Sequence, residues 1–469
     1  MSASVLYPGS VLSFTDTLSG KKVAFTPRDP GRAGIYWCGP TVYDHPHLGH
    51  ARSALGYDIL HRYLEWRGYD VKLVSNITDI DDNIIKRAAR EGRSEQEVAA
   101  EYERSYIDQM DRLGIAAPDL RPRATEYVPQ MIEVVSLLID RGYAYAVDGS
   151  GVYFDVDRLT DYGALVHRDV HDLREGAGAR VDVDERKDDP LDFALWKSAK
   201  PGEPAWPSPW GPGRPGWHIE CVAMALQILG ADFDIHGGGD DLVFPHHENE
   251  RAEASGTGRP FARTWIHNGM VQVSGEKMSK SLGNFTTLTE VLERYDARAL
   301  RLLILQTHYR KTMEINGSAL DQSAAAIGRL DAMARRATAA GIDLQAKIFV
   351  DELVDAFRDA MDDDLGTPSA VAVIFDGLRQ AHAALDDNDL VTAQALSATV
   401  AELAGVLGLT LDRGSSDGAD SDEISALVSA RQSARAGRDF AEADRLRDVL
   451  TARGIVVEDT PAGPVWRRA

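Results

Sequence analysis

The chain of 469 residues is long for a single hydrophobic core, so we expect two to four domains. Its 73 acidic and 51 basic residues give a formal net charge of −22. This charge excludes a basic footprint over the whole molecule, so a polyanion would have to bind at local basic patches. The sequence has no apolar run long enough for a membrane span and no secretory pattern at its start, and its two cysteines cannot form a disulfide framework. We therefore expect a cytoplasmic protein.

The first 300 residues alternate between patterns typical of strands and of helices. Residues 33–38 predict a buried strand, residues 47–67 a helix and residues 71–77 a second strand, an order typical of a parallel sheet. The alternation returns later, with helices expected at 217–230, 246–255 and 287–306 and strands at 232–236 and 264–273. Between these parts we expect helices at 95–113 and 125–141, a strand at 151–156 and an insertion over about 115–205.

The last third of the chain differs in composition. Residues 318–411 are rich in Ala and Leu at helical spacing and predict a helical bundle. Residues 412–423 are acidic, small and polar, which indicates a linker before a C-terminal module at 424–469. We therefore predict an α/β fold in which a Rossmann-like parallel-sheet domain over 1–317 is followed by an α-helical bundle and a small C-terminal module.

A short motif, His47-Leu48-Gly49-His50, opens the first long predicted helix. Backbone amides and the positive end of the helix dipole favour an anion there, and Gly49 leaves room for a flat ligand such as a nucleotide base. By itself, so short a motif more often marks capping or surface histidines.

A second motif, Lys277-Met278-Ser279-Lys280-Ser281, lies between two glycines in a predicted loop at 275–283. Mobile ammonium groups suit a polyphosphate whose charge moves, although the motif alone would indicate a solvated loop. The two motifs together, in this order, resemble the signature of class I aminoacyl-tRNA synthetases. Other strings resemble cysteinyl-tRNA synthetases over essentially the whole chain: WCGPTVYD at 37–44, NITDIDD at 76–82, RPGWHIEC at 214–221 and FDIHGGGDDLVFPHHENE at 233–250.

Two small departures from the family pattern are Leu48, in place of the commoner Ile, and Asp240, where a smaller polar residue is expected. No role is assigned to Asp240. The resemblance implies a ligase that activates L-cysteine with ATP and transfers the cysteinyl group to tRNA(Cys), with Mg²⁺ accompanying ATP. It implies the catalytic residues His47, His50, Lys277 and Lys280, and the adenylate-binding residues Lys280, Gly49, Gly239, Asp241, Thr41, Thr78 and Trp217. We expect a monomer.

The glycines at 237–239 indicate a ligand-binding site or a tight turn, independently of the resemblance. They follow a predicted strand, at the sheet edge where ligands bind, although a tight turn would need glycines as well. Trp217 alone would more often be a core residue.

Part of a metal site is visible in residue spacing. His246 and Glu250 lie four residues apart and share one helix face, while His247 has Arg251 at that spacing and is the weaker candidate. Cys38 and Cys221 are two soft ligands in the same predicted domain. Spacing alone leaves two buried thiols and a capping histidine as the commoner interpretation. The resemblance implies that one zinc ion binds Cys38, Cys221, His246 and Glu250 and distinguishes the substrate thiolate from a hydroxyl.

The C-terminal module is locally basic. Residues 431–468 contain eight arginines and six acids, a net charge of +2. Arginine pairs with phosphates and stacks on bases, although alternating charges are also typical of a solvated helix. The resemblance implies that the module binds the anticodon through Arg435, Asp444, Asp459 and Trp466.

Two other functions remain open at this point. A mycothiol cysteine ligase resembles the same catalytic core and transfers activated cysteine to an amino-sugar, but it lacks the C-terminal module and a carboxylate that matches Glu250. A catalytically inactive tRNA-binding paralogue is a further alternative, which the intact His47, His50, Lys277 and Lys280 disfavour.

Overall fold

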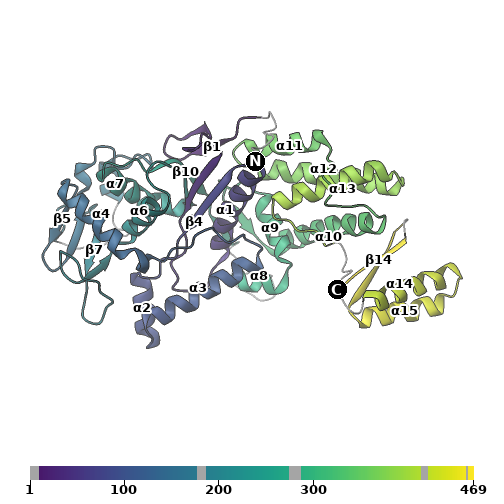
Figure 1. Ribbon diagram of the computed structural model, residues 1–469. Helices are drawn as coiled ribbons and strands as arrows, with labels where there is room; N and C mark the ends of the chain where they lie inside the picture. The colour runs from purple at the N-terminus through teal and green to yellow at the C-terminus, as the bar shows by residue number, and fades with distance from the viewer. Residues whose placement is uncertain (1–9, 177–185, 274–286, 413–420, 461–462, 469) are drawn as a thin grey trace. The chain divides into compact units, whose positions relative to one another are not determined.

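The computed structural model describes residues 10–176, 186–273, 287–412, 421–460 and 463–468 (Figure 1). The chain forms two compact units. The first contains Met1–Ala297, Thr307–Gly317 and Asp362–Leu365, and the second contains Arg298–Gln306, Ser318–Met361 and Gly366–Ala469. The chain thus returns to the first unit twice after Ala297.

A four-stranded parallel sheet organises the first unit. Its strands lie in the order β10 (Ala262–Asn268), β9 (Phe233–Gly239), β3 (Arg32–Trp37) and β4 (Asp70–Ser75). Helix α1 (Leu48–Trp66) connects β3 to β4, and α6 (Trp217–Ile228) precedes β9. Since β4 and β9 lie on opposite sides of β3, the carboxyl ends of β3 and β9 flank a switch point, where such sheets bind ligands.

The segment between β4 and α6 adds a second layer to this unit (Figure 1, blue to teal). It begins with α2 (Asp82–Glu91) and α3 (Glu95–Arg112), and then α4 (Val128–Asp140) packs on α6. An antiparallel sheet follows in the order β5 (Ala144–Val147), β6 (Gly151–Phe154), β7 (Phe193–Ser198) and β8 (Gly213–Pro215), with α5 (Val170–Gly176) between β6 and β7. Buried Phe154 and Trp196 join this sheet to the core under α6.

The remaining elements of the first unit surround the parallel sheet. Strands β1 (Ser13–Asp16) and β2 (Lys21–Ala24) form a hairpin, and α7 (Glu248–Gly256) leads from β9 toward β10 after short helical turns at Asp240–Leu242 and Val243–His247. Strand β11 (Val271–Val273) pairs in parallel with β12 (Met313–Ile315), and α8 (Leu288–Arg294) lies between them in sequence.

The described residues of the second unit are helical apart from one antiparallel pair of strands. Its bundle contains α9 (Ala297–Leu305), α10 (Gly317–Ala339), α11 (Asp351–Asp362), α12 (Thr367–Asp386) and α13 (Leu390–Val406). Arg301 is 1% exposed, and its Nη1 donates to the Leu407 carbonyl at 3.1 Å, just after α13 ends. The C-terminal part contains α14 (Ser421–Ala436), α15 (Phe440–Ala452) and the antiparallel strands β13 (Ile455–Thr460) and β14 (Gly463–Arg468).

The predicted α/β class with a helical C-terminal region is confirmed, but two predicted elements are each divided. The helix expected at 287–306 is interrupted because Tyr295 has extended backbone angles (φ −125°, ψ 149°), which separate α8 from α9. The strand expected at 264–273 is broken between β10 and β11 at Gly269 and Met270. Sequence patterns also missed α2 and the β1–β2 hairpin.

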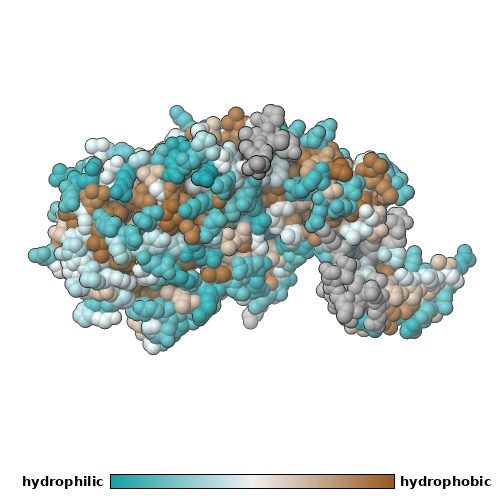
Figure 2. All heavy atoms as spheres, in the orientation of Figure 1, coloured by the Kyte–Doolittle hydropathy of each residue, from teal (hydrophilic) through white to brown (hydrophobic). Residues whose placement is uncertain are grey.

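No described helix is long and apolar enough to cross a bilayer. The face of the molecule in Figure 2 is mostly hydrophilic, with apolar residues scattered between polar ones.

Candidate functional site

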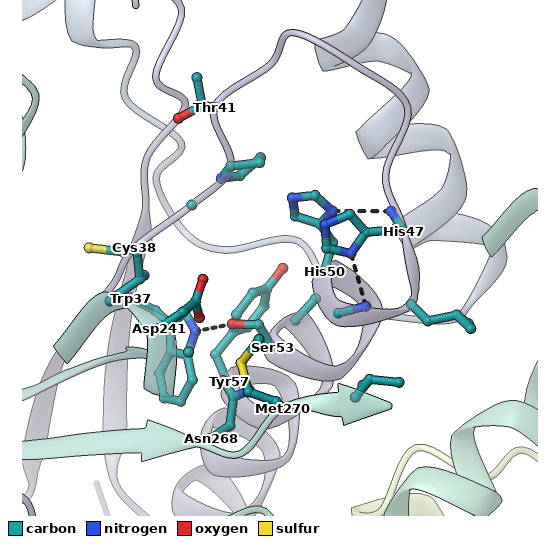
Figure 3. A pocket seen from close by; sticks show the side chains of 18 of the residues that line it. Trp37, Cys38, Thr41, His47, His50, Ser53, Tyr57, Asp241, Asn268 and Met270 are labelled. Atoms are coloured by element: carbon teal, nitrogen blue, oxygen red, sulfur yellow. Dashed lines mark hydrogen bonds between the residues drawn. The ribbon is translucent and has the colours of Figure 1, made fainter. Parts of the chain in front are cut away.

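A cavity of about 420 Å³ opens at the carboxyl edge of the parallel sheet (Figure 3). We call it the edge cavity. Its walls come from the end of β3, the start of α1, the end of β9 and the segment after β10. The lining includes Cys38, Thr41, His47, Gly49, His50, Trp217, Gly239 and Asp241 from the predicted site, together with Ser53, Asn268, Gly269, Met270 and Val271.

The two histidines of the first motif hold the start of α1. The His47 Nδ1 accepts from the Gly49 N–H at 3.1 Å, and the His50 Nδ1 accepts from the His47 N–H at 3.1 Å (Figure 3). Because burial lowers the pKa of both rings, that of His50 to about 3, both are neutral and carry their proton on Nε2. A Cβ on Gly49 would lie 2.9 Å from the His47 ring, so a larger residue at this position would displace the ring that accepts from the Gly49 N–H. Capping and ligand binding are therefore compatible roles for these rings.

The predicted adenylate residues occupy different parts of this region. Asp241 is exposed and lines the cavity, close enough to His47 for its charge to favour the protonated ring. Thr41 and Thr78 form an isolated parallel bridge. Thr78 is 2% exposed and its hydroxyl donates to Glu220 Oε2 at 3.0 Å, so Thr78 lies behind Thr41 and is not itself among the lining residues.

Four buried donor atoms meet beside the edge cavity. Cys38 directly follows β3, Cys221 lies on α6, His246 precedes α7 and Glu250 lies on α7. The Cys38 Sγ lies 3.7 Å from the Cys221 Sγ and 3.6 Å from Glu250 Oε1. The His246 Nε2 lies 3.6 Å from the Cys221 Sγ and 3.1 Å from Glu250 Oε1. The fold thus brings together the four residues that the resemblance implied, in positions from which they could hold a metal ion.

An overlapping group shares two of these donors and adds two more histidines, His236 and His247. The His236 Nε2 lies 2.7 Å from Glu250 Oε2. The His247 Nε2 lies 3.3 Å from the Cys38 Sγ, while its Nδ1 lies 2.7 Å from the His267 Nε2. The two rings lie next to the four donors. They could orient those donors, or they could themselves be ligands in an alternative metal site.

Burial controls the charges in this cluster. It raises the pKa of Cys38 well above its usual value, that of Cys221 to about 11, and that of Glu250. It also lowers the pKa of His246 well below its usual value. These shifts disfavour the charged forms of the two thiols, the carboxyl group and the imidazole, so a thiolate or carboxylate here needs a positive charge nearby to offset the cost of burial.

Trp217 connects the donor cluster to the cavity. Its ring stacks on the His246 ring, with centroids 4.1 Å apart and an interplanar angle of 21°, and it also lines the edge cavity. Cys38 is likewise both a donor and a lining residue. A molecule in the cavity would therefore meet the donor cluster at Cys38, while Cys221, His246 and Glu250 are not among the lining residues.

The remaining predicted residues are the two lysines of the second motif and four residues of the C-terminal module. Lys277 and Lys280 fall outside the described residues. Arg435 on α14 is exposed, as is Asp444 on α15, whose Oδ1 lies 2.9 Å from Arg447 Nη1. Trp466 on β14 is half-buried against a small core of Ile424, Val428, Leu450 and Ile455, and for Asp459 only the backbone in β13 is described.

Sequence reasoning missed other residues at the site. His236 lies in the HGGG string, where only the glycines were considered, and no spacing rule pairs it with Glu250. Asn76, which follows β4, accepts from the Gly39 N–H through Oδ1 at 2.9 Å. A Cβ on Gly39 would lie 1.7 Å from the Asn76 carbonyl oxygen, so the backbone after β3 needs glycine there.

Comparison with known proteins agrees with this arrangement. The family model for the class I (C) tRNA synthetase catalytic domain matches residues 24–325, a DALR domain matches 356–412, and a cysteinyl-tRNA ligase anticodon binding domain matches 418–467. The chain is 48% identical over 464 residues to a cysteine–tRNA ligase of Symbiobacterium thermophilum, covering 96% of this chain and 98% of that one. It is 47% identical over 466 residues to one of Halorhodospira halophila, with 98% and 100% covered.

Among solved structures, the fold is similar to that of a Mycobacterium tuberculosis methionyl-tRNA synthetase in complex with methionyl-adenylate. The TM-score is 0.58 at 15% identity, with 81% of this chain and 90% of that chain covered. At this identity the likeness supports the class I fold alone.

Proposed function

The chain belongs to the cysteine–tRNA ligase family, and from this premise we propose how its own residues carry out the family's reaction. It is an ATP-dependent ligase that joins L-cysteine to tRNA(Cys). The observation that carries the proposal is the cluster of four buried donor atoms at the wall of the edge cavity.

We assign the donors Cys38, Cys221, His246 and Glu250 to zinc. Tetrahedral zinc, with bonds of about 2.3 Å to sulfur and about 2.0–2.1 Å to nitrogen or oxygen, places two sulfurs about 3.8 Å apart. It places sulfur about 3.5 Å from nitrogen or oxygen, and nitrogen about 3.3 Å from oxygen. The observed donor distances of 3.7, 3.6, 3.6 and 3.1 Å follow this pattern. Two thiolates also favour zinc over a hard cation.

The overlapping set is less suited to a metal ion. The His247 Nε2 lies 3.9 Å from Glu250 Oε1, and the set contains a single sulfur. His236 from this set, and His218 from outside it, are better suited to orient the zinc ligands through hydrogen bonds. The His236 Nε2 lies 2.7 Å from Glu250 Oε2, and the His218 Nδ1 lies 2.8 Å from the His246 Nδ1, which leaves the His246 Nε2 for a metal ion.

Zinc at this site would supply a soft Lewis acid that prefers the thiolate of cysteine to the hydroxyl of serine, a distinction that a plain pocket makes poorly. The chain itself determines where the amino acid lies. Cys38 and Trp217 belong to both the donor cluster and the cavity wall, so the substrate side chain would enter between them.

The first motif would bind the nucleotide, which enters as its Mg²⁺ complex. His47 and His50 keep Nδ1 for the backbone and would direct Nε2–H toward the phosphates. Asp241 and Gly239 would bind the ribose of the nucleotide.

The cysteine carboxylate oxygen then attacks the α-phosphorus in line and pyrophosphate leaves, so the residues act by positioning and charge stabilisation. Lys277 and Lys280 are proposed to hold the departing phosphates, and Thr41, Thr78 and Trp217 to shape the cysteine and adenylate pocket.

We also propose that the chain divides into domains at 1–317, 318–411 and 424–469, with a linker at 412–423. The protein would act as a monomer in the cytoplasm. Arg435, Asp444, Asp459 and Trp466 would contact the anticodon. The net charge of +2 over 431–468 supports tRNA contact by the C-terminal module.

The acceptor decides between the candidate functions. Purified protein supplied with ATP and radioactive cysteine should transfer label to tRNA(Cys) and not to an amino-sugar. Label on the amino-sugar would indicate the mycothiol-type ligase, and the absence of cysteine-dependent ATP–pyrophosphate exchange would indicate an inactive paralogue.

A further inference from the structure

The guanidinium of Arg52 joins two segments of the first unit beside the edge cavity. Arg52 lies on α1, and its side chain is 2% exposed. Its Nη2 donates to the carbonyls of His308 and Tyr309, at 3.3 and 3.1 Å, and in a shorter contact to that of Lys311. Its Nε and Nη1 have no hydrogen-bond partner among the described residues. The side chain is thus committed to one turn of backbone, residues 308–311.

This turn supports one wall of the cavity. The Gly269 N–H donates to the Tyr309 carbonyl at 2.8 Å, and the Met313 N–H donates to the Met270 carbonyl at 3.0 Å. A Cβ on Gly269 would lie 2.6 Å from the Lys311 carbonyl, so the two backbones are in direct contact. Gly269, Met270 and Val271 line the cavity, and a shift of the turn would therefore move this wall.

The other side-chain hydrogen bonds of the turn to described residues go to partners outside α1. The Tyr309 hydroxyl donates to Asp364 Oδ1 at 2.7 Å, and the His308 Nε2 lies 2.9 Å from the Asp364 carbonyl. Asp364 is in turn held by Thr15 on β1, through its N–H at 2.7 Å and its hydroxyl at 2.6 Å. Among the described residues, the hydrogen bonds of Arg52 join the turn to the helix that begins with the histidine motif.

Placing a guanidinium here has a cost in desolvation. Burial lowers the pKa of Arg52 to about 10, opposed by the negative charge of Asp240, so the group remains charged at neutral pH. An apolar side chain of similar volume would often fill a buried space at equal or lower cost. An apolar side chain could not bind three converging carbonyls, which is what Arg52 does here.

We propose that Arg52 is a positioning residue for ATP, which sets the start of α1 and the wall Gly269–Val271 at the separation that one nucleotide needs. This inference rests on the proposed function, because it assumes that ATP occupies the edge cavity. Positioning of this kind affects nucleotide affinity and leaves the donor cluster for cysteine intact.

The test compares Arg52→Met and Arg52→Lys with the wild type in cysteine-dependent ATP–pyrophosphate exchange. Arg52→Met should raise the KM for ATP at least tenfold, while the KM for cysteine and the zinc content stay within about twofold of wild type. Arg52→Lys should recover a much lower KM for ATP, since one ammonium has three N–H groups for the same carbonyls.

The matched control is Arg301→Met, which removes an equally buried arginine that donates to a backbone carbonyl in the second unit. It should lower Tm and leave the KM for ATP unchanged. An unchanged KM for ATP in Arg52→Met, an equal rise in Arg301→Met, or a KM in Arg52→Lys as high as in Arg52→Met would each overturn the inference. A wild type without exchange would instead overturn the proposed function.

Discussion

Replacing Glu250 with glutamine tests the proposed zinc site with the least change in shape. The side chain is fully buried, with Oε1 at 3.1 Å from the His246 Nε2 and 3.6 Å from the Cys38 Sγ. The substitution keeps the volume but removes the negative charge from one of four donors. Loss of an outer partner alone typically costs about 10–100-fold in metal affinity, so loss of a charged ligand should cost about 10²-fold or more.

Zinc release to a competing chelator measures the affinity, and thermal unfolding of the metal-free protein measures stability. We expect weaker zinc binding and weaker cysteine binding, with the Tm of the metal-free protein changed little. The natural control is Glu253→Gln, one turn further along α7. Glu253 is also fully buried, and neither of its carboxyl oxygens has a hydrogen-bond partner among the described residues. Wild-type zinc affinity in Glu250→Gln, or equal zinc loss in Glu253→Gln, would refute the assignment of Glu250 as a ligand.

Three further outcomes are expected. Lys280→Ala should slow cysteine-dependent ATP–pyrophosphate exchange about 10²–10³-fold and leave cysteine affinity unchanged, and an unaltered exchange rate would reject the role of this lysine. Deletion of 424–469 should preserve exchange and greatly reduce charging of tRNA(Cys), whereas charging equal to that of the full chain would remove the anticodon role from this module. Cys38→Ser and Cys221→Ser should each lower bound zinc from about one per chain, because a neutral hydroxyl is a poor ligand. If zinc content measured by atomic absorption did not fall, the two thiols would be structural.

Sequence predicts those parts of the site whose residues lie within a few positions of one another, because helix geometry then determines where their side chains lie. His47 and His50 are recognisable because an N-terminal helix cap requires acceptors at defined spacing, and the same spacing places both rings at the cavity. His246 and Glu250 are recognisable because one helical turn brings them to one face. Their Nε2 and Oε1 atoms are indeed 3.1 Å apart, although His246 lies just before α7 begins.

The rest depends on contacts between segments that are distant in sequence. Cys38 and Cys221 are separated by 183 positions, and only the packing of α6 against the end of β3 makes their sulfurs neighbours. His236 meets Glu250 across the gap between β9 and α7, and Arg52 meets carbonyls some 256 positions later. Neither helical nor strand periodicity carries information about such pairs. Family resemblance identified the first pair, while His236 and Arg52 became visible only in the fold.

The position of the donor cluster bears on how cysteine is selected. If the four donors lay behind the cavity wall, a metal ion there would stabilise the fold and have no contact with the substrate. Cys38 instead lines the cavity, and Trp217 both lines it and stacks on His246. With ATP and cysteine bound as proposed, the same wall would adjoin the place where the carboxylate meets the α-phosphorus. In the proposed mechanism, selection by sulfur and activation of the carboxylate would occur on one bound molecule, so a serine that failed to engage the cluster would also be poorly placed for attack.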